Sequence, residues 1–127
     1  MTVTRHVLRL ITVCMLACLF LVQPGIAGAA SPGEQTRIDR LLDALGRQKD
    51  LVFIRNGSEH TAEAAVKHLK LKRRRAENRI TTAEQFIDML ASSSSLSQKP
   101  YMIQRPGQTP KPAGQYLHNL LREVAPQ

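Results

Sequence analysis

The stretch LVFIRNG, residues 51–57, lies between two segments with helical periodicity and contains the first strand pattern of the chain. Its first four residues, Leu51 to Ile54, are aliphatic or aromatic, which is typical of a short buried strand. Asn56-Gly57 follows them, and this pair tolerates the positive φ values of a tight turn. We therefore predict one strand that ends in a turn at residues 56–57.

Helices are expected on both sides of this strand. Ser31 can cap a helix that begins at Pro32, has Glu34 three residues after the cap and ends at Gly46. A second helix is expected from Thr61 to at least Arg75. The apolar positions of both recur at helical spacing: Ile38, Leu41, Leu42 and Leu45 in the first helix, and Ala62, Ala65, Val66 and Leu69 in the second.

The C-terminal half predicts two more helices and one more strand. A capping box from Thr81 to Glu84 opens a third helix, which buries Phe86, Ile87 and Leu90 and ends before the serines at 92–95. Residues 101–105, YMIQR, form the second strand candidate, and a last helix covers about Ala113 to Val124. The sequence therefore predicts an α+β, mainly helical fold with about four helices and one short two-stranded β ribbon, in a single compact domain.

Residues 1–29 have the three parts of a cleaved secretory signal peptide. Arg5 and Arg9 precede an apolar run at 10–22, and a break at Pro24 leads to small residues, so that cleavage is expected after Ala29 or Ala30. The run of 13 residues is too short to span a membrane, which takes about 20. We expect a periplasmic or secreted protein, residues 30–127, with no transmembrane helix after cleavage.

The charge and the cysteines narrow the classes of partner. Both cysteines lie in the signal segment, so no disulfide is expected. After cleavage, 16 basic and 10 acidic residues leave a net charge of +6. Outside the cytoplasm this charge favours an anionic envelope component or a protein partner, although it could also serve solubility alone. Nucleic acid is disfavoured, because four aromatic residues remain and none interleaves with the basic cluster.

The basic residues concentrate on and just after the second predicted helix. At about 100° per residue, His68, Lys72, Arg75 and Arg79 form one polar stripe beside the apolar face. Guanidinium groups match phosphate, sulfate and carboxylate, so this stripe is a candidate anion-binding face. The alternative interpretation is a solvated helix face whose long side chains cover apolar surface.

No residue is assigned a catalytic or metal-binding role, and no cofactor is predicted. Glu63 lies roughly 140° around the helix from His68, which separates the two metal-ligand types. The serines at 92–97 lack a Ser-x-x-Lys pattern. An alternative to a binding module is a small envelope hydrolase or transferase that uses His60 or His68 as general base for one of these hydroxyls. A structural or chaperone-like protein is a third possibility and would expose a large apolar patch.

Several motifs together resemble those of the YfeK-like family of small exported bacterial proteins. This family is classified as a domain of unknown function. They are FIRNGSEHT at 53–61, HLKLK at 68–72, RI at 79–80, and the segment from FI at 86–87 through SSSS at 92–95 to PY at 100–101. The resemblance covers about Arg37 to Leu121. It implies a signal peptide followed by one compact domain, and it brings no activity, ligand or cofactor.

The resemblance also adds emphasis to particular polar positions. The family positions matched here are Arg55, Asn56, Gly57, Glu59, His60, His68, Lys72, Ser92, Ser94, Ser95 and Tyr101. Gln98 departs from the family, whose members often have glycine there, and no cysteine accompanies Thr61 or the strands, which removes a redox role. The candidate ligand-binding residues are Arg55, Asn56, His60, His68, Lys72, Arg75, Arg79, Ser94, Ser95 and Tyr101.

Overall fold

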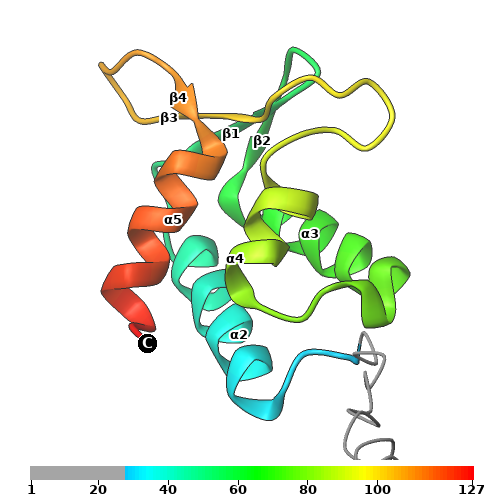
Figure 1. Cartoon of the computed structure of the whole chain (residues 1–127). Coiled ribbons are helices and arrows are strands. Elements are labelled where there is room, and N and C mark those ends of the chain that lie inside the picture. The colour runs from blue at the N-terminus through cyan, green and yellow to red at the C-terminus, as the bar shows by residue number, and fades with distance from the viewer. Residues whose placement is uncertain (1–27) are drawn as a thin grey trace, which may run out of the picture.

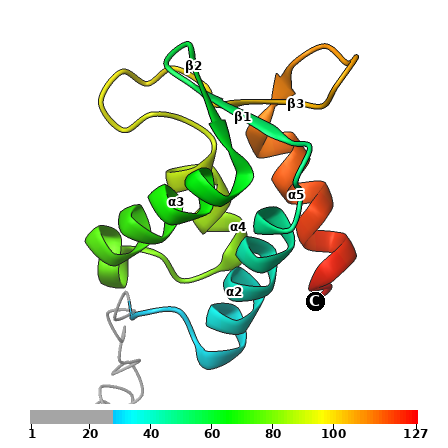
Figure 2. The same ribbon diagram turned by 180° about the vertical axis from the view of Figure 1, so that it is seen from behind.

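A four-stranded antiparallel sheet lies across one end of a group of helices in the computed structural model (Figures 1 and 2), which describes residues 28–127. Nearly all of the predicted signal peptide therefore lies outside the described residues. The elements in chain order are α2 (Pro32–Gly46), β1 (Val52–Arg55), β2 (Ser58–Thr61), α3 (Ala62–Ala76), the 3-10 turn η1 (Glu77–Arg79), α4 (Ala83–Phe86), the π-helical turn η2 (Ile87–Ala91), β3 (Met102–Gln104), β4 (Lys111–Pro112) and α5 (Ala113–Val124).

Across residues 28–127, the mainly helical α+β architecture with four α-helices agrees with the sequence prediction, but the two-stranded ribbon was wrong. The sheet has the order β2-β1-β3-β4. Asn56 and Gly57 have φ values of 50° and 79°, so they close a two-residue hairpin that pairs Arg55 with Ser58. The second strand of this hairpin, SEHT, is a polar edge strand, and β4 is two residues with a proline. Neither has the apolar alternation by which strands are recognised.

The helices enclose one hydrophobic core beneath the sheet. The apolar residues predicted to face the core from the first and third helices are all buried, as are Leu117, Leu120 and Leu121 of α5. Val66 and Val124 pack partly exposed at the margin of the core. The N-terminus of α2 is capped as expected, because Ser31 Oγ accepts a hydrogen bond from the Glu34 amide at 3.3 Å. Across the described residues, no helix combines the length and apolar character that spanning a membrane requires.

The start of α4 differs by one residue from the prediction. Thr82, not Thr81, is the N-cap, and its hydroxyl accepts from the Gln85 amide at 3.1 Å. Glu84 is thereby free to contact Arg37 of α2, whose guanidinium approaches its carboxylate to 2.7 Å. This ion pair joins the first and third predicted helices.

Candidate functional site

A cleft of about 490 Å³ lies between the β1–β2 hairpin, α3 and the serine-rich loop that leads to β3. Nine of the ten candidate ligand-binding residues line it: Arg55, Asn56, His60, His68, Lys72, Arg75, Ser94, Ser95 and Tyr101. The cleft also includes two residues that the sequence analysis did not select, Ser58 and Leu96. The two-residue turn was the available signal for Ser58, because it places this residue opposite Arg55.

Sheet and helix geometry explain why these residues meet. Phe53 pairs with His60 and Arg55 pairs with Ser58, so alternation along the strands places the four on one face of the hairpin. His68 and Arg75 lie about two turns apart on α3, with Lys72 between them, and therefore share one side of that helix. The hairpin runs directly into α3 (Figure 1). The two sets of side chains therefore meet in the lining of one cleft.

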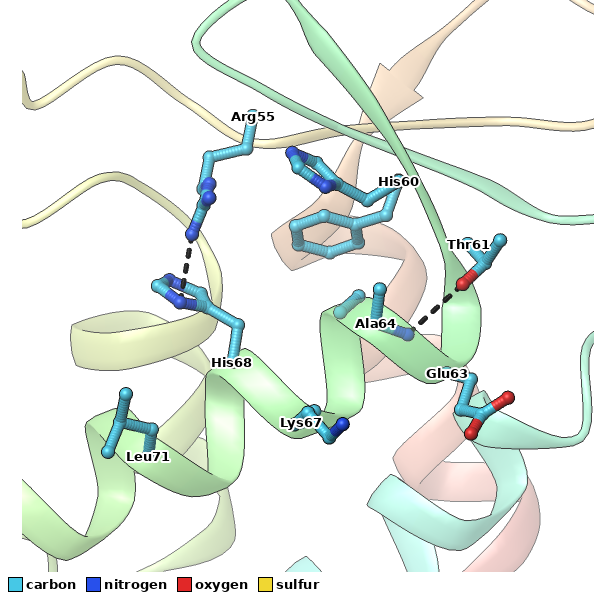
Figure 3. Close-up of a pocket in the computed structure, with 10 residues that line it drawn as sticks. Arg55, His60, Thr61, Glu63, Ala64, Lys67, His68 and Leu71 are labelled. Carbon is cyan, nitrogen blue, oxygen red and sulfur yellow. Dashed lines mark hydrogen bonds between the residues drawn. The ribbon is translucent and has the colours of Figure 1, made fainter.

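His68 lies at the centre of the site, between Arg55 and Tyr101. Arg55 Nη1 lies 2.8 Å from His68 Nδ1 (Figure 3), and the Tyr101 hydroxyl lies 3.4 Å from Nε2. A guanidinium can only donate, so Nδ1 accepts and the ring is neutral with its proton on Nε2. Burial first, and then the charge of Arg55, lowers the pKa of His68, which is consistent with a neutral imidazole.

Lys72 is a buried cation in this cleft, with 9% of its surface exposed. Its ammonium donates to the Ser93 carbonyl at 3.0 Å and to the Tyr101 hydroxyl at 3.3 Å, and it lies 5.1 Å from the centre of the Tyr101 ring. Burial, and then the charge of Arg55, lowers its pKa. Among the described side chains no carboxylate pairs with Lys72, and none lines the cleft.

Tyr101 supplies a hydroxyl with an unused proton. The residue is 1% exposed, and its ring packs on Phe53 with the ring centres 5.2 Å apart. The oxygen accepts from Lys72 and faces the Nε2 proton of His68, so the phenol proton has no acceptor among these neighbours. Burial raises the pKa of Tyr101, so the group stays neutral and can donate to a ligand.

The serine loop is held against the hairpin turn. Ser97 donates through its hydroxyl to Asn56 Oδ1 at 2.7 Å, and the Ser94 hydroxyl accepts from the Ser97 amide at 3.3 Å. Ser94 is buried, whereas Ser95 is exposed at the cleft. Ser94 therefore shapes the loop, and Ser95 is the serine of this pair that can reach a ligand.

Arg79 does not belong to the cleft, contrary to the stripe predicted from helical geometry. Helix α3 ends at Ala76 and the chain continues as the 3-10 turn η1, so the 100° spacing no longer applies at residue 79. Arg79 is exposed, and its Nε donates to the Ala76 carbonyl at 3.4 Å. The candidate anion site consists of Arg55, Lys72 and Arg75 without it.

The chemistry of the cleft is that of a donor-rich, cationic surface. Within residues 28–127 no group of three or more histidine, cysteine or acidic side chains is placed to hold a metal ion. His60 Nε2 is buried and has no hydrogen-bond partner in the part of the chain that the structure describes. Three cations, together with the Tyr101 proton and the Asn56 amide, instead face a space that contains no carboxylate among the residues described there.

The fold and cleft define a small α+β domain with a basic, donor-lined cleft between a hairpin and a helix. The family model with the description "Family of unknown function (DUF5329)" matches residues 32–125, and the chain belongs to this family. The chain is 51% identical over 89 residues to "Uncharacterized protein YfeK" of Salmonella typhimurium. The aligned region covers 70% of this chain and 73% of that protein. The comparison with solved structures gave no match.

Proposed function

We propose that this protein is a non-enzymatic binding module of the cell envelope and that it holds an anionic ligand in the basic cleft. The observation that carries this proposal is Lys72, a buried cation with no carboxylate partner among the described residues, beside Arg55 and Arg75. Burial of an unpaired charge destabilises a folded protein. An anion in the cleft would offset that cost, and guanidinium groups suit phosphate, sulfate or carboxylate.

The envelope location rests on the signal-peptide pattern of residues 1–29. An exported basic protein meets anionic envelope components or protein partners, which are the sources we propose for the ligand. Mass spectrometry of the protein recovered from the periplasm should give an N-terminus at Ala30 or Ser31. Recovery of the uncleaved chain from the cytoplasm would refute export.

Titration with inorganic phosphate, followed by NMR, tests anion binding at this cleft. The matched variants are Arg75→Gln, inside the cleft, and Arg79→Gln, outside it, because both remove one positive charge. A charge-assisted hydrogen bond contributes about 1.5–3 kcal/mol, so Arg75→Gln should weaken phosphate binding by roughly tenfold or more. Arg79→Gln should change it less than about twofold, as expected for a screened surface charge. Equal weakening by both variants, or no saturable binding by the unaltered protein, would refute the proposal.

The enzymatic alternative, a hydrolase or transferase with a His/Ser pair, needs a histidine within hydrogen-bond reach of a serine hydroxyl, directly or through one water. Both ring nitrogens of His68 instead face Arg55 and Tyr101. None of the hydrogen bonds among residues 28–127 joins His60 or His68 to a serine. The donor-rich cleft therefore supports binding better than nucleophilic catalysis. Hydrolysis of a generic ester that is abolished by both His68→Gln and Ser95→Ala would reverse this preference.

A further inference from the structure

A second cavity, of about 400 Å³, opens beside the basic cleft and shares Arg55, His60 and His68 with it. Figure 3 shows these three side chains directed toward one space above α3, with Arg55 joined to His68. The rest of its lining consists of four apolar residues, Phe53, Ala64, Ala65 and Leu71, and of Thr61, Glu63 and Lys67. The basic cleft and the second cavity therefore differ in polarity but share three lining residues at their boundary.

We propose that the ligand is an organic monoester of a tetrahedral oxyanion, phosphate or sulfate, whose compact apolar substituent occupies this second cavity. This inference rests on the proposed function, because the oxyanion would lie in the basic cleft. The apolar group would lie between the hairpin and α3, against Phe53, Ala64 and Leu71. A cavity of this size is within the range that encloses small organic molecules.

The arrangement of donors favours a tetrahedral oxyanion over a planar carboxylate. Lys72 and Arg75 approach the cleft from α3, Tyr101 from the position just before β3, and Asn56 from the hairpin turn. Asn56 Oδ1 already accepts from Ser97, which leaves the amide protons of this side chain for a ligand. Donors on three separate elements surround an acceptor whose oxygens point in several directions, whereas a carboxylate presents its two oxygens in one plane.

The charges around the second cavity leave its centre suited to an apolar group. Glu63 and Lys67 are four residues apart on α3, so their opposite charges lie on neighbouring turns and balance at its rim. Figure 3 shows Glu63 directed away from Arg55 and His68. The oxyanion would therefore be held at the Arg55 end, and the substituent would lie against the apolar wall.

The test compares inorganic phosphate, phenyl phosphate and phenol by isothermal titration. Removal of roughly 55 Å² of apolar surface from water corresponds to about a tenfold gain, so phenyl phosphate should bind about ten times more tightly than phosphate. Phenol should not bind measurably. Ala64→Leu, a change to a good helix former at an exposed position that lines only the second cavity, should abolish the tenfold gain and leave phosphate binding unchanged. Gln115→Leu, at an exposed position on α5, is the matched control and should preserve both affinities.

The outcomes separate this inference from the function on which it rests. If phosphate binds but phenyl phosphate gains nothing, or if Ala64→Leu leaves the gain intact, the second cavity does not hold the substituent and the inference is wrong. Tight binding of phenol would also contradict it, because the two hollows would then act separately. If neither phosphate nor phenyl phosphate binds, the proposed anion site itself is refuted.

Discussion

Gly114 of α5 lies so close to Ser92 that a methyl group at this position should destabilise the fold. A Cβ atom added to Gly114 would lie 2.5 Å from Ser92 Oγ and 3.2 Å from Ser92 Cβ. Ser92 begins the serine loop, and its hydroxyl donates to the Ile87 carbonyl at 2.8 Å. The substitution Gly114→Ala therefore forces the serine out of its hydrogen bond or moves α5 away from the loop.

The expected magnitude follows from three opposing contributions. Replacement of a helical glycine by alanine stabilises by about 0.5–1 kcal/mol. Loss of the Ser92 hydrogen bond costs about 1 kcal/mol. Overpacking at the remaining 3.2 Å carbon contact costs about 1–3 kcal/mol, because a close-packed interior cannot yield locally. We expect Gly114→Ala to lower the free energy of unfolding by about 1–3.5 kcal/mol and the urea midpoint by about 1 M or more.

Urea unfolding followed by circular dichroism measures this change, and a double-mutant cycle with Ser92→Ala identifies its cause. Ser92→Ala removes the atom in closest contact, so Gly114→Ala should cost about 1 kcal/mol less in that background. A Gly114→Ala protein as stable as the unaltered one would refute the reasoning. The same loss in both backgrounds would show that the Ser92 hydroxyl is not the obstacle.

Three further predictions concern the backbone, the site and the helix contacts. Gln98 has a φ of 58°, so Gln98→Gly should be more stable than Gln98→Ala by about 1 kcal/mol in urea unfolding, and equal stabilities would argue against a left-handed conformation. Folding lowers the pKa of His68 from 6.5, so the unfolded chain binds the proton more readily than the folded protein. The free energy of unfolding should therefore fall as the pH drops below 6.5. In His68→Gln, the urea midpoint should depend less on pH in this range. Arg37 lowers the pKa of Glu84, so this ion pair should stabilise the fold at neutral pH and lose its effect below about pH 4.5. Arg37→Met should therefore lower the free energy of unfolding by about 1 kcal/mol at pH 7 and by less at pH 3. An equal loss at both pH values would exclude the ion pair as the source of the change.

The helices could be predicted from sequence because each has a local signal. Helix α2 has a cap, an apolar stripe and a terminal glycine, and its bounds match the prediction. The strands carried less information, because β2 and β4 are short edge strands stabilised by pairing rather than by an apolar pattern. Their formation depends on β1 and β3, which lie far apart in the chain and pair Phe53 with Ile103. Contacts of that range are not visible in local periodicity.

The cleft could be predicted in large part because its residues lie in a few dense polar segments. The limits of the prediction come from tertiary structure. The predicted position of Arg79 in the polar stripe required α3 to continue to residue 79, but the helix ends three residues earlier, at Ala76. Nothing in the local pattern of residues 73–79 marks that end. The second cavity was also missed, since its wall combines Phe53 of a strand with Ala64 and Leu71 of a helix, each of which reads as ordinary core or surface in the sequence.

Two kinds of feature that lower the stability of the fold are concentrated at the basic cleft. The two residues other than glycine with positive φ in the described chain are Asn56 and Gln98, at the two turns that frame the cleft, and Ser97 joins one turn to the other. The buried Lys72 lines the same cleft without a carboxylate partner among the described side chains. Backbone strain and an uncompensated buried charge do not improve a hydrophobic core, and both tend to occur at functional sites. Because both features occur at the same donor-lined cleft, a ligand-binding role is favoured over the alternative that its positive charge serves solubility alone.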